Sequence, residues 1–300
     1  MNIINLEVYW EKIKIFFRKR KHSVVIFAII VFLIYIIMRR RINKVVVFDL
    51  DETLGYFSQL GLFYDGLREY LDKDGELSQT YINELFDLYP EALRPGILQI
   101  LRYLKIQREN KKCKRVLIYT NNQGPKEWAN CIKNYFHKKL DYNIFDQIIA
   151  AFKVAGKQIE PNRTQHGKSV DDLFNCTKLP DNTEIFFLDD QYHPDMEDAS
   201  VWYFHLRPYK CNLSKSQLIY RFLDSKLASK IQDPENFVNF MENYLQSSDR
   251  ATNCKDMEFK KEGQYVLDKL HNFFKPEKLH NKSAKRRKRS KNTTLKNSKI

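Results

Sequence analysis

The sequence predicts an α/β protein, a three-layer sandwich in which a mostly parallel sheet of five strands lies between helices. Two observations support this prediction. Short, densely apolar runs alternate with segments of helical periodicity, and several of these runs end directly in acidic or hydroxyl residues. Buried parallel strands have this composition because helices cover both faces of the sheet, and functional groups collect where such strands end. The expected strands are KVVVFD (44–49), RVLIYT (115–120), FDQIIAAF (145–152), TEIFFLDD (183–190) and SVWYFHL (200–206).

Helical patterns separate these strands. One helix is expected to begin after Pro95, another at Lys126, and a short one, which carries Val170, at Lys168. Beyond Ser214 the chain has helical patterns only, in SQLIYRFLDSKL, DPENFVNFMENYL and QYVLDKLHNFF. The second of these begins with an Asp cap followed by proline, as helices often do. We expect these accessory helices to pack on the core or on one another.

The segment between Asp51 and Arg94 is about forty residues long, which is too short for a large mobile cap domain. We therefore expect a functional site at the strand ends to be open to solvent. An open site suits a bulky substrate, whereas a capped site encloses a metabolite. Four aromatic side chains in this segment either line a groove for substrate or simply cover the sheet. They are Tyr56, Phe57, Phe63 and Tyr64.

Charge is distributed unevenly along the chain. Residues 1–44 carry a net charge of +8 and residues 275–300 carry +10, which leaves −4 for residues 45–274 of the formal total of +14. The predicted folded part is mildly acidic and is therefore not built as a cradle for nucleic acid. The five cysteines follow no CxxC or metal-binding spacing, so we expect free thiols in a reducing compartment.

The amino-terminal segment, residues 1–43, is predicted to be a membrane anchor. The fifteen residues from Val24 to Met38 carry no charge and lie between RKRKH and RRR. This stretch is slightly shorter than the roughly 17 to 25 residues of a typical span, and flanking Arg and Lys side chains can extend it by snorkelling. A buried core helix is the alternative. The residues from Ile3 to Phe17 have the spacing of an amphipathic helix on the membrane surface or of an ordinary solvated helix.

The carboxyl-terminal segment, residues 276–300, is basic and poor in apolar residues, so we expect it to be disordered. Its KRRKRSK run fits a nuclear address, a contact with anionic lipid or nucleic acid, or a solubilising tail, and the sequence does not separate these functions. The predicted organisation is an anchor over 1–43, an α/β domain over 44–212, a helical extension over 213–275 and a basic tail over 276–300.

Three strand ends place oxygen-bearing side chains at one edge of the predicted sheet. Asp49 and Asp51 lie two positions apart, which directs both side chains to one side in extended backbone. Two carboxylates this close repel each other unless a cation lies between them or one holds a proton. Thr120 ends the second strand, and Asp189 and Asp190 end the fourth. A group of carboxylates without soft ligands suits Mg²⁺. The alternative interpretation of DLDETL is a strand followed by an ordinary capped turn without a functional site.

A lysine is expected beside these carboxylates. Lys168 lies in HGKSVDDLF at the start of a predicted helix, whose amino-terminal dipole also favours anions. Lys157 is a rival for the same position. A hydroxyl and an ammonium group next to a metal site suit the remaining oxygens of a phosphate.

These motifs, taken together and in this order, resemble the haloacid dehalogenase (HAD) superfamily. More narrowly, they resemble the phosphatases that act on the carboxy-terminal domain of RNA polymerase II, the NLI-interacting-factor-like branch. The likeness covers residues 44 to about 210 and implies a HAD-like Rossmannoid core without a large cap. The motifs that carry it are DLDETL (49–54), RPG (94–96), YT (119–120), GKS (167–169) and the acidic pair at 189–190.

The resemblance implies a role for each motif residue. Asp49 would be the nucleophile that forms an aspartyl-phosphate, and Asp51 would protonate the leaving oxygen and later take a proton from water. Mg²⁺ would be held by Asp49, by Asp51 through its main-chain carbonyl, by Asp190 and by Asp189. Thr53 would hold the loop. The phosphoryl group would be bound by Thr120, Asn121 and Lys168.

Two departures from this branch leave the substrate open. TNNQG (120–124) is closer to the polynucleotide 3′-phosphatases and histidinol phosphatases of the same superfamily, and DDQYHPDM replaces the usual short continuation after the acidic pair. The expected function is a Mg²⁺-dependent phosphatase acting on phosphoserine or phosphothreonine in a protein. The alternatives are a nucleic-acid 3′-phosphatase, a small-metabolite phosphatase, or a catalytically idle binding module of the same fold at a membrane, as in the mitochondrial import receptor that resembles this branch.

We expect a single-pass membrane protein whose α/β domain lies on the cytosolic or nuclear side. Unpaired thiols and substrates phosphorylated in those compartments both favour this side. The basic tail would then be free to contact anionic lipid.

Overall fold

The computed structural model describes residues 43–71, 77–245 and 257–275 of the chain. The predicted membrane anchor and the predicted basic tail lie outside the described residues, apart from the first strand residue at position 43. Among the helices that the structure describes, none combines the length and apolar character needed to cross a membrane.

The sheet has five strands, all parallel, in the order β3-β2-β1-β6-β7. β1 is central, since it pairs with β2 on one side and with β6 on the other, and its buried residues 45–48 are all apolar. Val46 lies opposite both Val116 and Phe186. This confirms the predicted five-stranded parallel sheet, with strand ends shifted by a few residues. The strands are β1 (Asn43–Phe48), β2 (Arg115–Tyr119), β3 (Gln147–Ile149), β6 (Thr183–Asp189) and β7 (Val201–His205).

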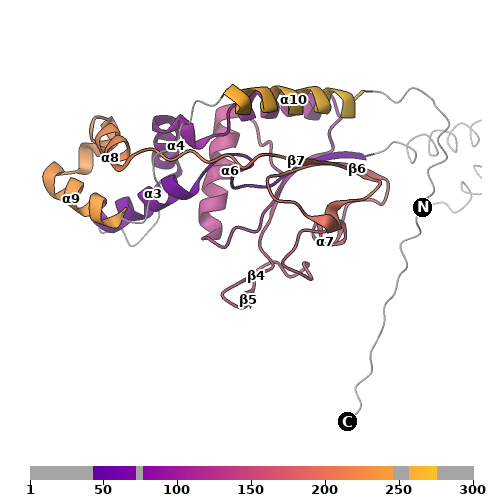
Figure 1. Cartoon of the computed structure of the whole chain (residues 1–300), viewed down its shortest axis with the longest axis horizontal. Coiled ribbons are helices and arrows are strands. Elements are labelled where there is room, and N and C mark those ends of the chain that lie inside the picture. Colours follow the sequence, from indigo (N-terminus) through magenta and orange to yellow (C-terminus); the bar gives the residue numbers. More distant parts are fainter. Residues whose placement is uncertain (1–42, 72–76, 246–256, 276–300) are drawn as a thin grey trace, which may run out of the picture.

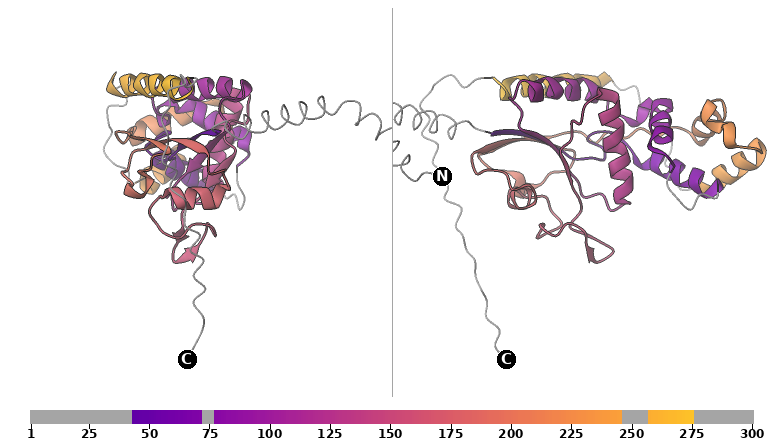
Figure 2. Two further views of the ribbon diagram at one scale, coloured as in Figure 1. Left: turned by 90° about the vertical axis from the view of Figure 1, so that its right-hand side faces the viewer. Right: turned by 180° about the vertical axis from the view of Figure 1, so that it is seen from behind.

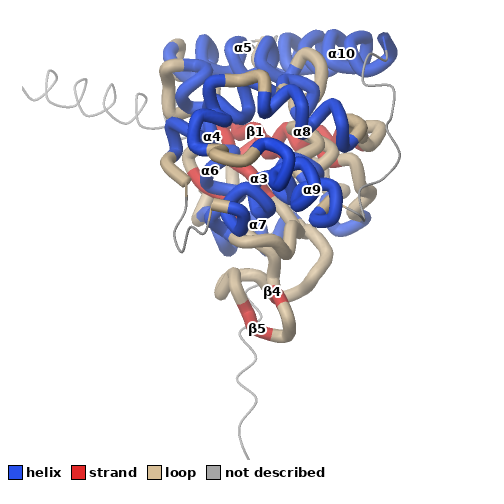
Figure 3. Tube along the Cα trace, turned by 90° about the vertical axis from the view of Figure 1, so that its left-hand side faces the viewer, coloured by secondary structure: helices blue, strands red, loops and turns tan. Residues whose placement is uncertain are grey.

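Helices cover both faces of this sheet because successive β1 side chains point to opposite sides. Val46 and Phe48 belong to the larger core, which also contains side chains of α5 (Ile97–Glu109), α6 (Lys126–Leu140) and α10 (Met257–Phe273). Val45 and Val47 belong to a smaller core closed by α7 (Val170–Thr177). α5 and α10 lie side by side above the sheet (Figures 1 and 3).

Four helices gather beyond the end of the sheet at which β1 finishes (Figure 3). Two of them, α3 and α4, were not predicted from the sequence. Phe57 and Phe63 are fully buried among them, so the interpretation that these aromatic side chains line a groove for substrate is wrong. The Phe63 ring instead meets Phe222 at a centroid distance of 5.5 Å, which joins α3 to α8. The four helices are α3 (Ser58–Tyr70), α4 (Gln79–Leu88), α8 (Lys215–Leu223) and α9 (Pro234–Tyr244).

A small antiparallel hairpin projects from the α7 side of the sheet (Figure 2). Its strands are β4 (Lys153–Val154) and β5 (Lys157–Gln158). Ala155 and Gly156 between them both have positive φ, 48° and 78°, as a two-residue hairpin turn requires. The predicted third strand, 145–152, is therefore shorter than expected and gives way to this projection.

The expectation that all cysteines are free thiols is wrong for Cys211, which is disulfide-bonded. Its side chain packs in a small separate cluster with Tyr56, Tyr209 and Phe259. Cys254 lies outside the described residues. Unpaired thiols consequently no longer argue as a set for a reducing compartment. Among the residues that the structure describes, Cys113 and Cys176 are free thiols.

We expect Gly55→Ala to destabilise the fold by about 2 kcal/mol or more, because a Cβ there would lie 2.3 Å from the carbonyl oxygen of Ala92. Gly167→Ala is the matched control, since its nearest contact is 3.6 Å, from a flexible glutamine side chain. Thermal denaturation of the purified proteins measures both. Equal unfolding temperatures for the two variants would contradict the close approach at Gly55.

Candidate active site

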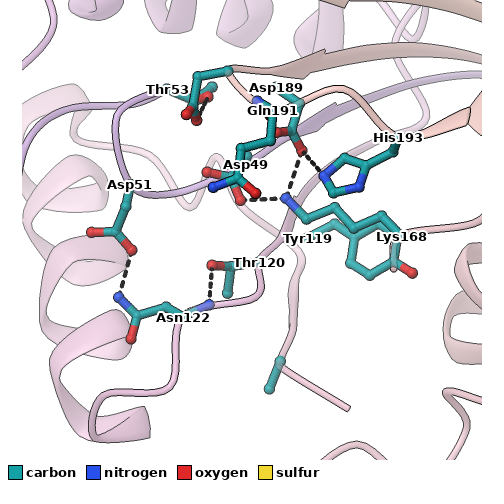
Figure 4. Close-up of polar contacts among 12 residues, drawn as sticks. Asp49, Asp51, Thr53, Tyr119, Thr120, Asn122, Lys168, Asp189, Gln191 and His193 are labelled. Atoms are coloured by element: carbon teal, nitrogen blue, oxygen red, sulfur yellow. Dashed lines mark hydrogen bonds and ion pairs between the residues drawn. The ribbon is translucent and has the colours of Figure 1, made fainter. Parts of the chain in front are cut away.

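The carboxyl ends of β1, β2 and β6 bring the predicted site residues to one edge of the sheet (Figure 4). Asp49 follows β1 directly, Thr120 follows β2, and Asp189 is the last residue of β6. β1 lies between β2 and β6, so all three side chains meet. The chain order reverses between β1 and β6, and ligands of doubly wound sheets bind at such a switch point.

Lys168 joins two of the carboxylates. Its side chain is 2% exposed, and its Nζ pairs with the Asp49 carboxylate and with Asp189 Oδ2, the latter at 2.6 Å. The same Asp189 oxygen lies 3.4 Å from His193 Nε2, and its other oxygen accepts the main-chain N–H of Gln191 at 2.8 Å. Asp189 is therefore fully engaged by the protein itself.

Three carboxylates form a possible metal site. Ligand atoms of Asp49, Asp189 and Asp190 all lie within 4.8 Å of one another, and all three residues are buried. The donors are hard carboxylate oxygens, which fit Mg²⁺ by type. The Asp51 side chain is not a member of this group, so of the four predicted metal ligands three are brought together through their side chains. Thr53 Oγ1 donates to Asp190 Oδ1 at 3.0 Å and so orients one of them.

Asp51 is held instead by an amide that the sequence analysis did not single out. Asn122 Nδ2 donates to Asp51 Oδ2 (Figure 4). Asn122 is itself fixed, because its main-chain N–H donates to Thr120 Oγ1 at 3.0 Å and its Oδ1 accepts the N–H of Gly124 at 2.6 Å. The TNNQG run was noted as unusual, and this asparagine supplies a structural reason for it.

Arg163 is a second residue that sequence reasoning missed as part of the site. Its guanidinium is buried and donates to the carbonyl oxygens of Thr120, at 3.2 Å, and Gly167, at 3.1 Å. It thus ties the end of β2 to the residue before Lys168. No periodicity or motif in the sequence indicates this contact, since Asn162-Arg163-Thr164 reads only as a glycosylation acceptor pattern.

The structure favours Lys168 over Lys157 for the lysine position. Lys157 is exposed on the β4–β5 hairpin, whereas Lys168 is buried between carboxylates. The helix α7 begins two residues later than expected, at Val170, and Ser169 is its N-cap through a hydrogen bond from the N–H of Asp172. Lys168 therefore precedes the cap rather than opening the helix.

Burial dominates the electrostatics of the site. It raises the pKa of Asp49 to about 8, an effect that Lys168 opposes and the charges of Asp189 and Asp190 reinforce. Burial likewise raises the pKa of Asp51 and of Asp190, against hydrogen bonds from Asn122 and Thr53 respectively. For Asp189 the effect of burial is outweighed by the contacts of His193 and Lys168, so its pKa is lowered.

A pocket of about 170 Å³ opens over these residues. Its lining contains carboxylates and amides, and its positive charge comes from Lys168. No residue of α3 or α4 lines it. The lining residues are Asp49, Asp51, Glu52, Thr120, Asn121, Asn122, Lys168, Asp190 and Gln191.

The fold and this edge together define an α/β protein of the Rossmann-like class with an acidic, lysine-containing pocket at its switch point. Comparisons with protein-family models, with curated proteins and with solved structures give no match to this chain. The likeness to HAD phosphatases is therefore carried by the short motifs alone.

The raised pKa of Asp49 predicts a pH dependence of stability in the metal-free protein. A carboxyl whose pKa rises from 3.8 to about 8 on folding stabilises the fold fully below about pH 4, and this contribution is lost as the pH rises towards 8. The free energy of unfolding of the wild type should therefore fall relative to that of Asp49→Asn between pH 4 and 8, by at least about 1.4 kcal/mol. Urea denaturation of both proteins in excess chelator measures it, and a pH-independent difference would contradict the assignment.

Proposed function

We propose that this chain is a Mg²⁺-dependent phosphatase of the HAD type, which hydrolyses phosphate monoesters through an aspartyl-phosphate on Asp49. The observation that carries the proposal is the arrangement around the Asp49 carboxylate. Asp49 lines the pocket, and its carboxylate pairs with the buried ammonium of Lys168. Oxygen atoms of Asp49, Asp189 and Asp190 lie within 4.8 Å of one another. Phosphoryl transfer requires this combination of a carboxylate and positive charge more than it requires elaborate covalent chemistry.

In the first step an Asp49 oxygen attacks phosphorus, and the bond from phosphorus to the ester oxygen of the substrate breaks. Lys168 fixes the orientation of the attacking carboxylate and offsets negative charge that accumulates on the phosphoryl oxygens. The Thr120 hydroxyl and the Asn121 main chain, both at the pocket wall, bind the phosphoryl group. The product of this step is an acyl phosphate on Asp49.

Asp51 transfers the protons. Its raised pKa keeps a proton available for the departing ester oxygen, and the Asn122 amide holds the carboxyl in place. In the second step the Asp51 carboxylate takes a proton from water, which attacks phosphorus and releases phosphate and free Asp49. Asp51 lines the pocket outside the three-carboxylate group, a position that suits proton transfer better than metal binding by its side chain.

The residues that would hold Mg²⁺ are Asp49 and Asp190, with the main-chain carbonyl of Asp51 and, less directly, Asp189. When bound, the ion neutralises negative charge and positions the phosphate. Asp190 is better placed than Asp189, because Asp189 is already engaged by Lys168, His193 and a main-chain N–H.

The pocket wall favours a phosphoprotein over the other substrates considered. Glu52 lines the pocket, and its negative charge disfavours a polyanion such as a nucleic-acid 3′ end. The α3 and α4 segment does not cover the pocket, so a phosphoserine or phosphothreonine on a polypeptide can enter. A metabolite phosphatase more often encloses its substrate.

Asp49→Asn should abolish hydrolysis of a generic aryl phosphate, with a loss of about a thousandfold or more, because the amide is not a nucleophile.

Activity of the wild type should require Mg²⁺ and vanish in excess chelator, and Zn²⁺ should restore it poorly since the ligands are oxygens. Steady-state release of phosphate measures all three.

Asp181→Asn is the matched control, since Asp181 is an exposed carboxylate before β6, and it should retain full activity. Wild-type turnover in chelator, or retained activity in Asp49→Asn, would refute the mechanism. A protein that binds phosphopeptides without any turnover would instead be the idle module. Relative kcat/KM for a phosphoserine peptide, a 3′-phosphorylated oligonucleotide and a sugar phosphate separates the substrate classes.

We further propose that residues 24–38 anchor the protein in a membrane with the α/β domain on the cytosolic or nuclear side. The protein should then remain in the membrane pellet after a salt wash and carry no glycan. The chain has three N-glycosylation acceptor patterns, which begin at Asn162, Asn175 and Asn212. Asn162 and Asn175 are the informative acceptors because both are exposed, whereas Asn212 is buried. Glycosidase-sensitive mass that disappears in Asn162→Gln or Asn175→Gln would place the domain in the lumen, the side that the disulfide-bonded Cys211 favours.

A further inference from the structure

Arg94 forms hydrogen bonds with the loop that follows the proposed nucleophile, Asp49. Its side chain is 3% exposed, and it donates to three successive main-chain carbonyl oxygens of this loop. Nη2 donates to Glu52 at 2.6 Å, Nε to Thr53 at 2.7 Å, and its own main-chain N–H to Leu54 at 3.1 Å. A single residue thus fixes the direction in which the chain leaves Asp49 and Asp51.

The other side of the Arg94 guanidinium is held by the last described helix, α10. Nη1 pairs with Glu262 Oε2 at 2.6 Å, and Glu262 Oε1 accepts the main-chain N–H of Arg207 at 3.1 Å. Two glycines let α10 approach this closely. A Cβ on Gly263 would lie 3.0 Å from the Pro95 carbonyl oxygen and 3.5 Å from the Gly96 Cα. α10 is therefore docked directly on the RPG segment.

The loop needs such support because its backbone is unfavourable by itself. Glu52 has a φ of 60°, a left-handed conformation that costs a non-glycine residue roughly 1 kcal/mol or more. Thr53, whose carbonyl Arg94 holds, uses its hydroxyl to hold Asp190. The Arg94 contacts thereby also set the position of the β1 loop relative to a carboxylate on the neighbouring strand.

We propose that Arg94 and Glu262 form a clamp through which α10 positions the Asp49–Gly55 loop, so that the pocket is complete only when α10 is docked. Neither residue lines the pocket, and both are positioning residues rather than catalytic ones. The catalytic unit accordingly includes residues up to at least Glu262, beyond the α/β domain predicted over 44–212. The effect on turnover rests on the proposed phosphatase function, whereas the effect on loop order does not.

The test compares two glutamates of α10 in the purified full-length protein. Glu262→Gln removes the charge that Arg94 pairs with and keeps the size of the side chain. Glu258→Gln is the matched control: Glu258 lies one turn earlier and pairs with the exposed side of Arg207 at 3.0 Å. Arg94→Lys is the second variant, because a lysine keeps the charge and cannot reproduce the fork of donors.

Hydrogen exchange read by mass spectrometry reports on loop order without any need for activity. In Glu262→Gln and Arg94→Lys the amides of residues 50–56 should exchange at least about tenfold faster than in the wild type, while those of α6 remain unchanged. Glu258→Gln should match the wild type in both segments. Equal acceleration in the loop and in α6 would mean global destabilisation and would overturn the proposal, as would unchanged loop exchange in both clamp variants.

Steady-state kinetics add the functional arm. Both clamp variants should lose about 10- to 100-fold in kcat with KM changed less than about twofold, and should need more Mg²⁺ for half-maximal rate, because misplacement affects the reacting groups more than substrate capture. A wild type without turnover would refute the phosphatase function and leave the exchange result to decide the clamp. Faster loop exchange together with unchanged kcat would overturn the claim that the clamp serves catalysis.

Discussion

The rest of the site depends on the ion pairs that the buried ammonium group of Lys168 makes with two carboxyl groups. This ammonium group lies buried between the carboxyl groups of Asp49 and Asp189, with Asp190 close by, so one positive charge faces three acidic groups in a poorly hydrated place. Without it the strand ends of β1 and β6 would carry adjacent, uncompensated carboxylates. When all three carboxyl groups are ionised, their negative charge exceeds the single positive charge of Lys168. A divalent cation would neutralise the excess, so the ion pairs of the protein and a bound metal complement each other.

Two buried guanidinium groups build the frame around this balance. Arg94 binds carbonyl oxygens of the loop after β1, and Arg163 binds those at the end of β2 and before Lys168. Both act mainly on main-chain atoms, which cannot change their protonation state. The contacts that these two guanidinium groups make with the loop carbonyls are therefore indifferent to pH, while the groups that the loops position titrate. Such a separation lets the carboxylates change charge during a reaction without releasing the backbone that carries them.

The sheet and its flanking helices were predictable because their apolar periodicity is local and strong, as in the run from Val45 to Phe48. The same holds for Asp49, Thr120 and Lys168, whose motifs stand at strand ends or just before a helix. α3 was missed because its Phe63 packs against Phe222 of α8, and α4 because its Phe86 stacks on Trp128 and Tyr135 of α6, all partners far along the chain. Asn122, Arg163 and the disulfide state of Cys211 depend on partners distant in sequence or on loop geometry, which periodicity does not encode. Asp51 was assigned to the metal partly by analogy, and only the structure shows its side chain turned towards an amide.

The contact between Arg94 and Glu262 spans 168 residues, and this distance has a consequence for synthesis. A chain emerging from the ribosome exposes the β1 loop, Thr120 and Lys168 long before α10 exists, and domains begin to fold from the amino-terminal side. During that interval Arg94 has loop carbonyls to bind and no carboxylate to face. Closing so long a loop is slow, so under the proposed clamp the emergence of Glu262, in the second turn of α10, marks the moment at which the nascent protein first acquires an ordered pocket.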